Sequence, residues 1–429
     1  MNPGNTWLKS ALKKAILLLS VLPLFASAQD SVQVETKDIK DVIKAWRKDT
    51  TKTFNPELVI GKNYISLLPV VGYAPANGFL IGATVSVNKL FSRPPTNLST
   101  MLFNFKITSK KQFIILARSK IFLDANKWFL QGDWRLLFFA QPTYGLGINH
   151  NEGNKFLINV NGLETTETPL EEPMRFNYVR FYEDVVRRIG KGRWYAGIGV
   201  AFDYHYAIKD QKLSLDTANL YITNHYAYQR LHGFELDRYS TNGFNINILT
   251  DGRDNVANPY KGYFASVSFR YNSTALGSTK ESTMVLYDLR YYLNLSKERP
   301  RHLIAFWMLG NLVSGGEVPY LALPSIGWDT YNRTGRGYIQ GRYRGLDLLY
   351  TEAEYRFPIS GDGFLGGVTF LNATFASSHL QELLDKAAPG VGAGLRLKMD
   401  KMARINLTVD LGYGADNSSG IYFDLQETF

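Results

Sequence analysis

The chain has 429 residues, of which 45% are hydrophobic and 14% aromatic, with 37 Gly, no Cys and a formal net charge of +10. This length suffices for two soluble domains or one large barrel, and the lack of Cys excludes a fold stapled by disulfides. A basic balance can indicate nucleic-acid binding, but an exported chain meets no nucleic acid routinely. Anionic lipid is therefore the expected partner for the positive charge, and the lining of a lumen is the alternative.

The export signal lies at the N-terminus. It begins with three basic residues, Lys9, Lys13 and Lys14. An apolar run over residues 15–25 follows, and small residues then occupy Ala26 and Ala28. The run is shorter than the roughly 20 residues that a membrane-spanning helix needs. We therefore expect residues 1–28 to be a secretory signal peptide, with Gln29 as the mature N-terminus after Sec-type export.

Residues 29–62 read as a polar periplasmic arm. Four apolar side chains within it recur at helical spacing: Ile39, Val42, Ile43 and Trp46. The spacing predicts a short amphipathic helix. A plug segment or a disordered arm are the alternatives.

The remaining chain, residues 63–429, alternates apolar and polar residues in short segments separated by turn signals. In residues 404–411, for example, Ile405, Leu407 and Val409 alternate with Asn406 and Thr408. Period two is typical of strands, and here we expect the apolar face to meet lipid and the polar face to line a lumen. Sixteen such segments are predicted, beginning near residues 64, 79, 99, 111, 127, 174, 193, 241, 261, 281, 300, 345, 364, 389, 402 and 419.

The connections between these segments fall into two sets. Every second connection is short, as expected of periplasmic turns, and the three long ones all belong to the other set, at about residues 140–173, 209–240 and 315–344. An even strand number with short turns at one end and long loops at the other is typical of outer-membrane barrels. The predicted fold is an all-β, sixteen-stranded antiparallel transmembrane β-barrel with a short helical arm.

The chain ends in an alternating segment that contains Tyr422 and Phe423 and finishes at Phe429. A last strand with a terminal aromatic residue is the usual outer-membrane sorting signal, because its free edge can pair with the assembly machinery. An ordinary edge strand is the alternative.

Two further segments contain candidate functional residues. One is a predicted periplasmic turn with Asp251, Arg253, Asp254, Asn258, Pro259 and Gly262. Asp and Asn in such turns accept hydrogen bonds from local backbone amides, so we interpret this segment as structural and not as a metal or acid–base cluster. The other segment, in the third long connection, consists of Gly335, Arg336, Gly337 and Tyr338. Its glycines allow a tight turn around a permanently charged guanidinium.

These two segments and the last strand resemble the BamA/TamA-like outer-membrane assembly-factor superfamily, the bacterial surface antigen barrels, over residues 64–429. The resemblance implies a sixteen-stranded barrel whose sixth surface loop folds into the lumen and carries an Arg-Gly-aromatic tip. By the strand count, the third long connection is this sixth loop.

A guanidinium in a lumen requires a carboxylate and further hydrogen-bond acceptors. The period-two pattern places Glu352 and Glu354 on the polar face of one strand and Asp410 on that of another. In the family, the tip arginine docks on an acid in a Phe-Xaa-Asp-Xaa-Gly pattern, and here Asn372 stands in place of the acid. The candidate lumen partners of Arg336 are therefore Glu352, Glu354, Asn372 and Asp410, and a solvated Arg336 is the alternative.

Catalysis is not expected. The one close Ser/His cluster, Ser377, Ser378 and His379, places the imidazole beside its serines and not across a site from them. No phosphate-binding glycine loop or zinc-binding HExxH motif occurs in the sequence. We therefore predict no catalytic residue, no metal and no cofactor, with a lipid hydrolase at the barrel rim as the enzyme alternative.

The resemblance implies insertion or translocation of protein or lipid at the outer membrane of a Gram-negative bacterium. Family members usually carry periplasmic POTRA domains, and residues 29–62 are too few to hold one. We therefore expect outer-membrane lipids as partners, with periplasmic or outer-membrane assembly partners supplied in trans, and no nucleic acid. A passive or gated channel and a structural surface antigen are the alternatives.

Overall fold

The computed structural model describes residues 36–48, 59–74, 78–93, 96–148, 171–299, 301–377 and 380–429. The expected signal peptide lies outside these residues. No helix in the described ranges has the length and apolar character needed to cross a membrane.

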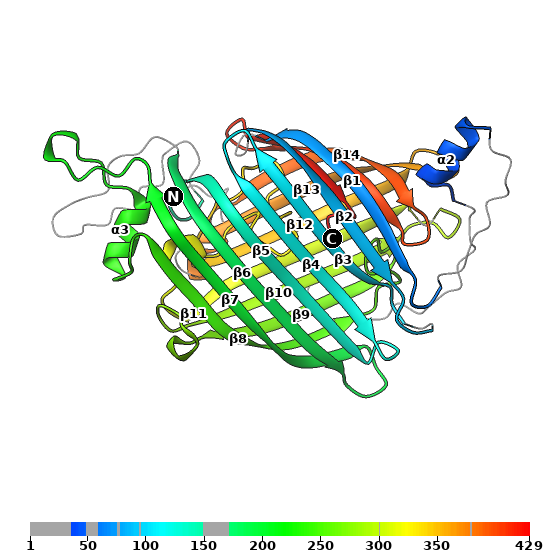
Figure 1. Cartoon of the computed structure of the whole chain (residues 1–429), viewed down its shortest axis with the longest axis horizontal. Coiled ribbons are helices and arrows are strands. Elements are labelled where there is room, and N and C mark those ends of the chain that lie inside the picture. The colour runs from blue at the N-terminus through cyan, green and yellow to red at the C-terminus, as the bar shows by residue number, and fades with distance from the viewer. Residues whose placement is uncertain are drawn as a thin grey trace, which may run out of the picture.

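Sixteen strands form one antiparallel sheet in which each strand pairs with its neighbour in the chain (Figure 1). The first eight are β1 (Asn63–Ala74), β2 (Gly78–Lys89), β3 (Ser99–Thr108), β4 (Phe113–Leu123), β5 (Trp128–Thr143), β6 (Glu172–Arg188), β7 (Trp194–Asp210) and β8 (Arg238–Asp251). The others are β9 (Gly262–Asn272), β10 (Ser282–Asn294), β11 (Leu303–Gly316), β12 (Asp347–Pro358), β13 (Leu365–Ser377), β14 (Ala388–Asp400), β15 (Ile405–Gly414) and β16 (Ser419–Leu425). The predicted fold is confirmed, with each strand beginning within a few residues of the expected position.

The long connections lie at one end of the barrel. That end carries α3 (Asn224–Leu231), whereas the helix of the N-terminal arm, α2 (Ile39–Trp46), lies at the other end with the short turns (Figure 1). α3 packs into the mouth of the barrel, where Ala227 and Tyr228 join an apolar cluster with Val318, Tyr320 and Leu323. The short η3 helix (Tyr320–Ala322) belongs to the loop between β11 and β12. Two long loops therefore meet over the lumen.

α2 is attached through its polar side to the short turns at its end of the barrel. Asp38 caps the helix by accepting hydrogen bonds from the backbone amides of Lys40 and Asp41 at 3.0 and 3.2 Å, which satisfies amides that have no partner inside the helix. Lys401, in the turn between β14 and β15, forms an ion pair with Asp41 at 2.9 Å. The arm thus contains the predicted helix, held at the barrel rim.

The two faces of the sheet differ as the alternation predicts. Five outward apolar side chains of β1 and β2 are each more than 60% exposed: Ile65, Leu67, Val71, Phe79 and Ile81. The inward positions of β15, by contrast, are Asn406, Thr408 and Asp410, all buried. An apolar outer band around a polar interior is the pattern of a barrel that lies in lipid.

The seam between β1 and β16 is not closed by a ladder. Within the described strands, hydrogen-bonded pairing runs from β1 to β16 without joining the two ends. Instead, Leu425 packs in one cluster with Leu102 of β3 and Leu68 of β1, which are lumen-facing positions. Side chains alternate between the two faces of a strand, so Leu425 points to the same face of β16 as the outward Ile421 and Phe423. The outer face of β16 therefore overlaps the inner face of β1–β3.

This overlap corrects one expectation. Ile405 has the parity of a lipid-facing residue, but it is fully buried in the same cluster as Leu425. The strand also begins at Ile405 and not near residue 402, because Arg404 has a positive φ of 53° and belongs to the turn. The final strand ends at Leu425, and Phe429 lies in the lumen against Trp307 instead of extending the edge. Its role in sorting stays a prediction.

Candidate functional site

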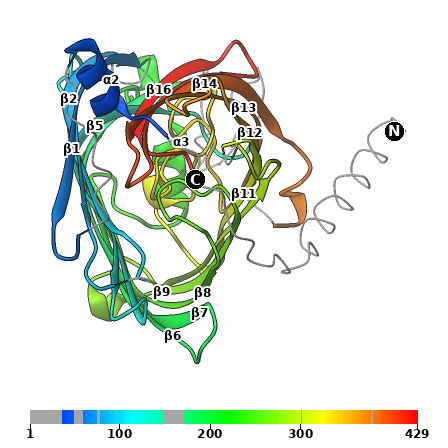
Figure 2. The ribbon, with the colours of Figure 1, turned by 90° about the vertical axis from the view of Figure 1, so that its right-hand side faces the viewer.

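The connection between β11 and β12, residues 317–346, folds back into the barrel. Figure 2 shows this yellow segment inside the ring of strands. We call it loop six, and its residues 335–338 the tip. The tip lies against β13–β16, next to the seam.

Two glycines allow the tip to turn. Gly335 and Gly337 have φ values of +80° and +108°, which side chains disfavour. A Cβ at Gly337 would also lie 2.7 Å from the backbone carbonyl of Tyr413. The barrel wall also carries glycines where it meets the tip. A Cβ at Gly412 would lie 2.8 Å from the Gly337 nitrogen, and one at Gly390 would lie 2.7 Å from the Arg336 oxygen. Backbone therefore packs directly on backbone where loop six meets β14 and β15.

Arg336 is fully buried and contacts three carboxylates. Its Nε and Nη2 donate to the two oxygens of Glu352 at 3.1 and 2.6 Å, and its Nη1 donates to Asp410 at 2.7 Å. Nη2 also donates to Glu354. The side chains of all four residues have no exposed surface. Charge-assisted, bidentate contacts of this kind fix the guanidinium in position and orientation.

The same carboxylates contact further arginines. Glu354 accepts from Arg356 at 2.6 Å, and Asp410 accepts from Arg396, which also contacts Glu427 at 2.7 Å. We call this group the carboxylate network: Arg336, Arg356, Arg396, Glu352, Glu354, Asp410 and Glu427. Its three guanidiniums face four carboxylates, and its members come from loop six, β12, β14, β15 and the C-terminal segment. The network thus connects loop six to the last residues of the chain.

Asn372 contacts the tip differently from the guanidinium partners. Its Nδ2 donates to the backbone oxygen of Arg336 at 3.0 Å, so it contacts the peptide and not the side chain. Phe370, two residues earlier on β13, places its ring 3.6 Å from the guanidinium carbon, within the range of a cation–π contact. The segment that replaces the family's acidic pattern therefore still holds the tip.

The tip also contacts β16 directly. The Tyr422 hydroxyl accepts from the Gly337 amide at 2.8 Å and donates to the Tyr338 oxygen at 3.2 Å. The Tyr338 hydroxyl in turn donates to the Pro389 carbonyl of β14 and accepts from the Ala415 amide. Tyr422 therefore faces the lumen, whereas Phe423 faces outward and is 40% exposed. A movement of the tip would remove hydrogen bonds from the strand at the seam.

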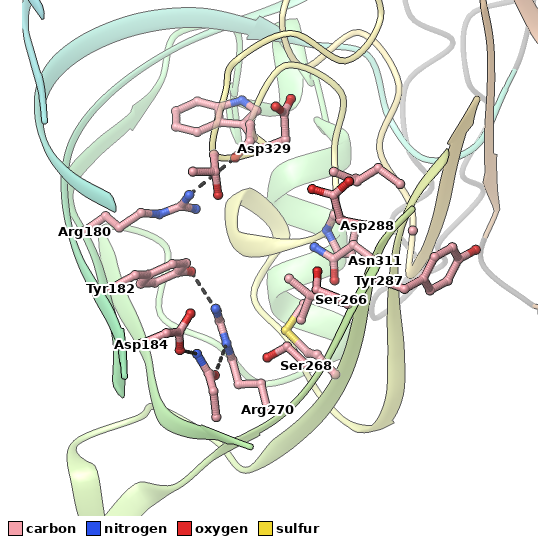
Figure 3. Close-up of a pocket in the computed structure, with 18 of the residues that line it drawn as sticks. Arg180, Tyr182, Asp184, Ser266, Ser268, Arg270, Tyr287, Asp288, Asn311 and Asp329 are labelled. Carbon is pink, nitrogen blue, oxygen red and sulfur yellow. Dashed lines mark hydrogen bonds between the residues drawn. The ribbon is translucent and has the colours of Figure 1, made fainter. Parts of the chain in front are cut away.

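The opposite flank of loop six rests on a second charged cluster. Arg135 of β5 donates to the backbone oxygen of Asp329 at 2.8 Å and pairs with Asp133 at 2.7 Å. Beyond it, a cavity of about 200 Å³ opens among β6–β11 and loop six (Figure 3). Arg270 projects into this cavity and donates to Tyr182 at 2.7 Å (Figure 3). Polar groups thus line the lumen on both sides of the loop.

The turn between β8 and β9 combines local contacts with contacts to the turn between β14 and β15, where Arg404 pairs with Asp254 at 2.7 Å. Arg253 donates through two nitrogens to both oxygens of Asp251, at 2.9 and 2.7 Å. Asp254 accepts from the Tyr260 amide at 2.9 Å. The Asn258 side chain donates to the backbone oxygen of Arg404, in the turn between β14 and β15, at 3.3 Å. Gly262 has a φ of +107°, and Pro259 lies between Asn258 and Gly262 in the sequence. No group of three acidic or histidine residues suited to a metal occurs in the described part of the chain.

Sequence reasoning missed several residues of the site. Arg396 and Tyr422, as a tip contact, lie on lumen-facing strand positions, so the alternation could have indicated them. Glu427 follows the end of β16 and shares the alternation of the outward Ile421 and Phe423, so the pattern gave no signal for it. The flat glycine wall at Gly390 and Gly412 was visible as a run of alternating glycines in β14 and β15. Of the Ser/His cluster at residues 377–379, only Ser377 belongs to the described residues.

The sixteen-stranded sheet, its apolar outer band and its charged lumen define the chain as an outer-membrane β-barrel. The model of the Omp85 superfamily domain matches residues 195–429, more than half of the chain. The chain belongs to the Omp85 superfamily, and its location is the outer membrane.

Seventy chains of solved structures match this fold. One, the crystal structure of BamA from Haemophilus ducreyi lacking POTRA domains 1–3, has a TM-score of 0.51 and 12% identity, over 85% of this chain and 69% of that chain. CdiB from Acinetobacter baumannii has a TM-score of 0.49 and 12% identity, over 85% of this chain and 59% of that chain. No curated protein sequence matches. At such identity, the likeness to BamA is one of fold.

Proposed function

We propose that the barrel inserts or translocates protein or lipid at the outer membrane by opening sideways at the seam, with loop six controlling the opening. Membership of the Omp85 superfamily supports a role in outer-membrane insertion or secretion. The observation that carries the proposal is the seam itself, where β16 overlaps β1–β3 through side chains and no ladder joins β1 to β16 in the described strands.

The missing ladder lowers the free energy needed to open the wall. Hydrogen bonds contribute about 0.5–1.5 kcal/mol each to stability, so a ladder along the seven residues of β16 would add several kcal/mol. β1 also contains Pro69, which has no amide hydrogen to donate and is typical of an edge strand. The overlap is therefore the weakest junction in the wall.

Loop six supplies the control. The tip contacts β16 through Tyr422, and the carboxylate network reaches the C-terminal segment through Glu427. Release of the tip would remove the Tyr422 contact from β16 and would take the Arg336 guanidinium out of the network, which would leave Arg396 paired with Asp410 and Glu427. In this proposal no nucleotide or metal takes part, and the C-terminal Phe429 and the turn at Asp251–Arg253 have structural roles.

Depletion of the protein, followed by profiling of outer-membrane proteins and lipids, would name the client class. Complementation should then use a Leu68→Cys/Leu425→Cys variant bridged by a cleavable bismaleimide. The chain has no native Cys, so the bridge forms only at the seam. We expect complementation only after cleavage of the bridge. An Ile198→Cys/Ile246→Cys pair, on the adjacent paired strands β7 and β8, should complement in both states. Full complementation by the bridged seam variant would contradict the proposal.

A gated channel is the second candidate, favoured by the polar cavity beside Arg270. If the protein is a channel, the wild-type protein should conduct ions in planar bilayers. A braced barrel should be mostly closed and should conduct after Arg336→Ala.

A further inference from the structure

A second cavity, of about 220 Å³, lies at the seam, where β16 overlaps the inner face of the first strands. One side is the inner face of β1–β5, with Val70, Lys106 and Arg118. The other side is β16, including its outward Ile421 and Phe423, and loop six forms the remaining wall. We call it the wedge cavity. Ile421 and Phe423 are 50% and 40% exposed, so the lining of the wedge cavity includes accessible side chains from the outward face of β16.

The charged lining of the wedge cavity is predominantly positive. It contains three cations, Lys106, Arg118 and Arg333, and one carboxylate, Asp424. Arg333 pairs with Asp424, and Arg118 lies 3.9 Å from the same carboxylate. Lys106 has Asp424, Arg333 and Arg118 as its charged neighbours. One carboxylate cannot neutralise three cations, so the site has an excess positive charge close to the seam.

Much of the remaining lining is apolar, which is unusual for a barrel interior. Inward positions of β4 and β5 carry Ile114, Leu116, Leu137 and Phe139, all buried. These side chains flank Lys106 and Arg118 on the same wall. The wedge cavity therefore offers a cationic part and a hydrocarbon part side by side.

We propose that the wedge cavity binds a phosphate-bearing lipid that enters through the seam, with its headgroup at Lys106, Arg118 and Arg333. Lys and Arg are the side chains that bind phosphate oxygens, and anionic lipid headgroups are drawn to clustered basic residues. The volume is below the roughly 300–1,000 Å³ of pockets that enclose a drug-sized ligand. It suits a headgroup, while the acyl chains remain outside along Ile421 and Phe423. The inference rests on the proposed function, since entry requires the seam to open.

The test is calorimetric titration of the purified full chain, in detergent, with dihexanoyl phosphatidylglycerol, glycerol 3-phosphate and inorganic phosphate. We expect the lipid to bind at least tenfold more tightly than either soluble phosphate. Lys106→Gln should weaken lipid binding at least tenfold, and Lys106→Arg should restore it. Lys398→Gln removes a buried lumen lysine that contacts Tyr260 and lies outside the wedge cavity, and it should bind as the wild type does. Heat-modifiable gel migration checks that every variant is folded.

Two results would overturn the inference. Unchanged lipid binding by folded Lys106→Gln would show that the lipid does not bind in the wedge cavity. Equal affinities for inorganic phosphate and for the lipid would show that the cavity binds soluble phosphate. The bridged Leu68→Cys/Leu425→Cys variant separates the inference from the proposed function. If the wild type binds no lipid but bridging still abolishes complementation, only the inference fails. If bridging leaves complementation intact while Lys106-dependent lipid binding persists, the proposed function fails.

Discussion

Replacing Arg336 with alanine removes the cation that three buried carboxylates share. After the change, Glu354 keeps Arg356 and Asp410 keeps Arg396. Among the described residues, Glu352 keeps only the Tyr350 hydroxyl, at 2.5 Å. One buried carboxylate is therefore left without a cation, which costs about 3–5 kcal/mol in comparable broken pairs. We expect the docked tip to lose this amount of stability relative to an undocked loop, a change of about two to three and a half powers of ten in population.

A double variant isolates the cause. Arg336→Met together with Glu352→Gln removes the pair but leaves no unpaired charge, and replacing a buried pair by neutral groups is often nearly neutral. The double variant should therefore keep the tip docked more fully than Arg336→Ala does. Arg336→Lys keeps the charge but loses the bidentate contact with Glu352, and an intermediate effect is expected.

Ion conductance in planar bilayers and protease cleavage within loop six report on the docked tip. Arg336→Ala should raise both, and the double variant should raise them less. If Arg336→Ala matched the wild type in both assays, the network would have no bracing role. If the double variant gave the same conductance and cleavage as Arg336→Ala, the unpaired charge of Glu352 would not be the cause of the undocked tip.

Three further changes test other contacts. Asn372→Asp should weaken tip docking by about 1–3 kcal/mol, because a carboxylate would replace the amide donor opposite a backbone oxygen; bilayer conductance should rise, and an unchanged value would contradict this. Gly412→Ala places a Cβ 2.8 Å from the tip backbone, whereas Gly361→Ala meets nothing within 4 Å; overpacking costs about 1–3 kcal/mol, so only the first should raise protease cleavage of loop six. At the periplasmic rim, burial alone would raise the pKa of Asp41, but the Asp38 backbone and Lys401 outweigh it and hold the pKa below its ordinary 3.8. A carboxyl with a lowered pKa stabilises docking above its ordinary pKa and loses this effect as pH falls through the lowered value. A fluorophore on α2 should thus report a docked helix at neutral pH and release only in strong acid, and Lys401→Ala should release it at neutral pH.

The strands were predictable because period two follows directly from strand geometry. The lumen positions of Glu352, Glu354 and Asp410 follow from the same parity. What parity cannot give is the overlap at the seam. Ile405 and Leu425 have outward parity, yet both are buried because the outer face of β16 lies against another strand's inner face. That arrangement depends on contacts between the two ends of the sheet.

Two other features had no local signal. α3 was not expected in the second long loop, because Asn224–Leu231 is short and its stability comes from packing against loop six and the barrel wall. Asn372 occupies the position at which the family carries an acid, and the sequence alone left open which carboxylates would serve instead. Three of them from two other strands converge on Arg336 only once the barrel is curved.

The central claim is that the wall is weakest between β1 and β16 and that the docked tip restrains it. Pulsed electron–electron distance measurements between spin labels at Leu67→Cys and Leu411→Cys span this junction, and labels at Ile198→Cys and Ile246→Cys span a paired one. We predict a broad distribution across the seam that shifts to longer distances with Arg336→Ala, beside a narrow and unchanged one for the control pair. A seam distribution as narrow as the control and insensitive to Arg336→Ala would contradict the account.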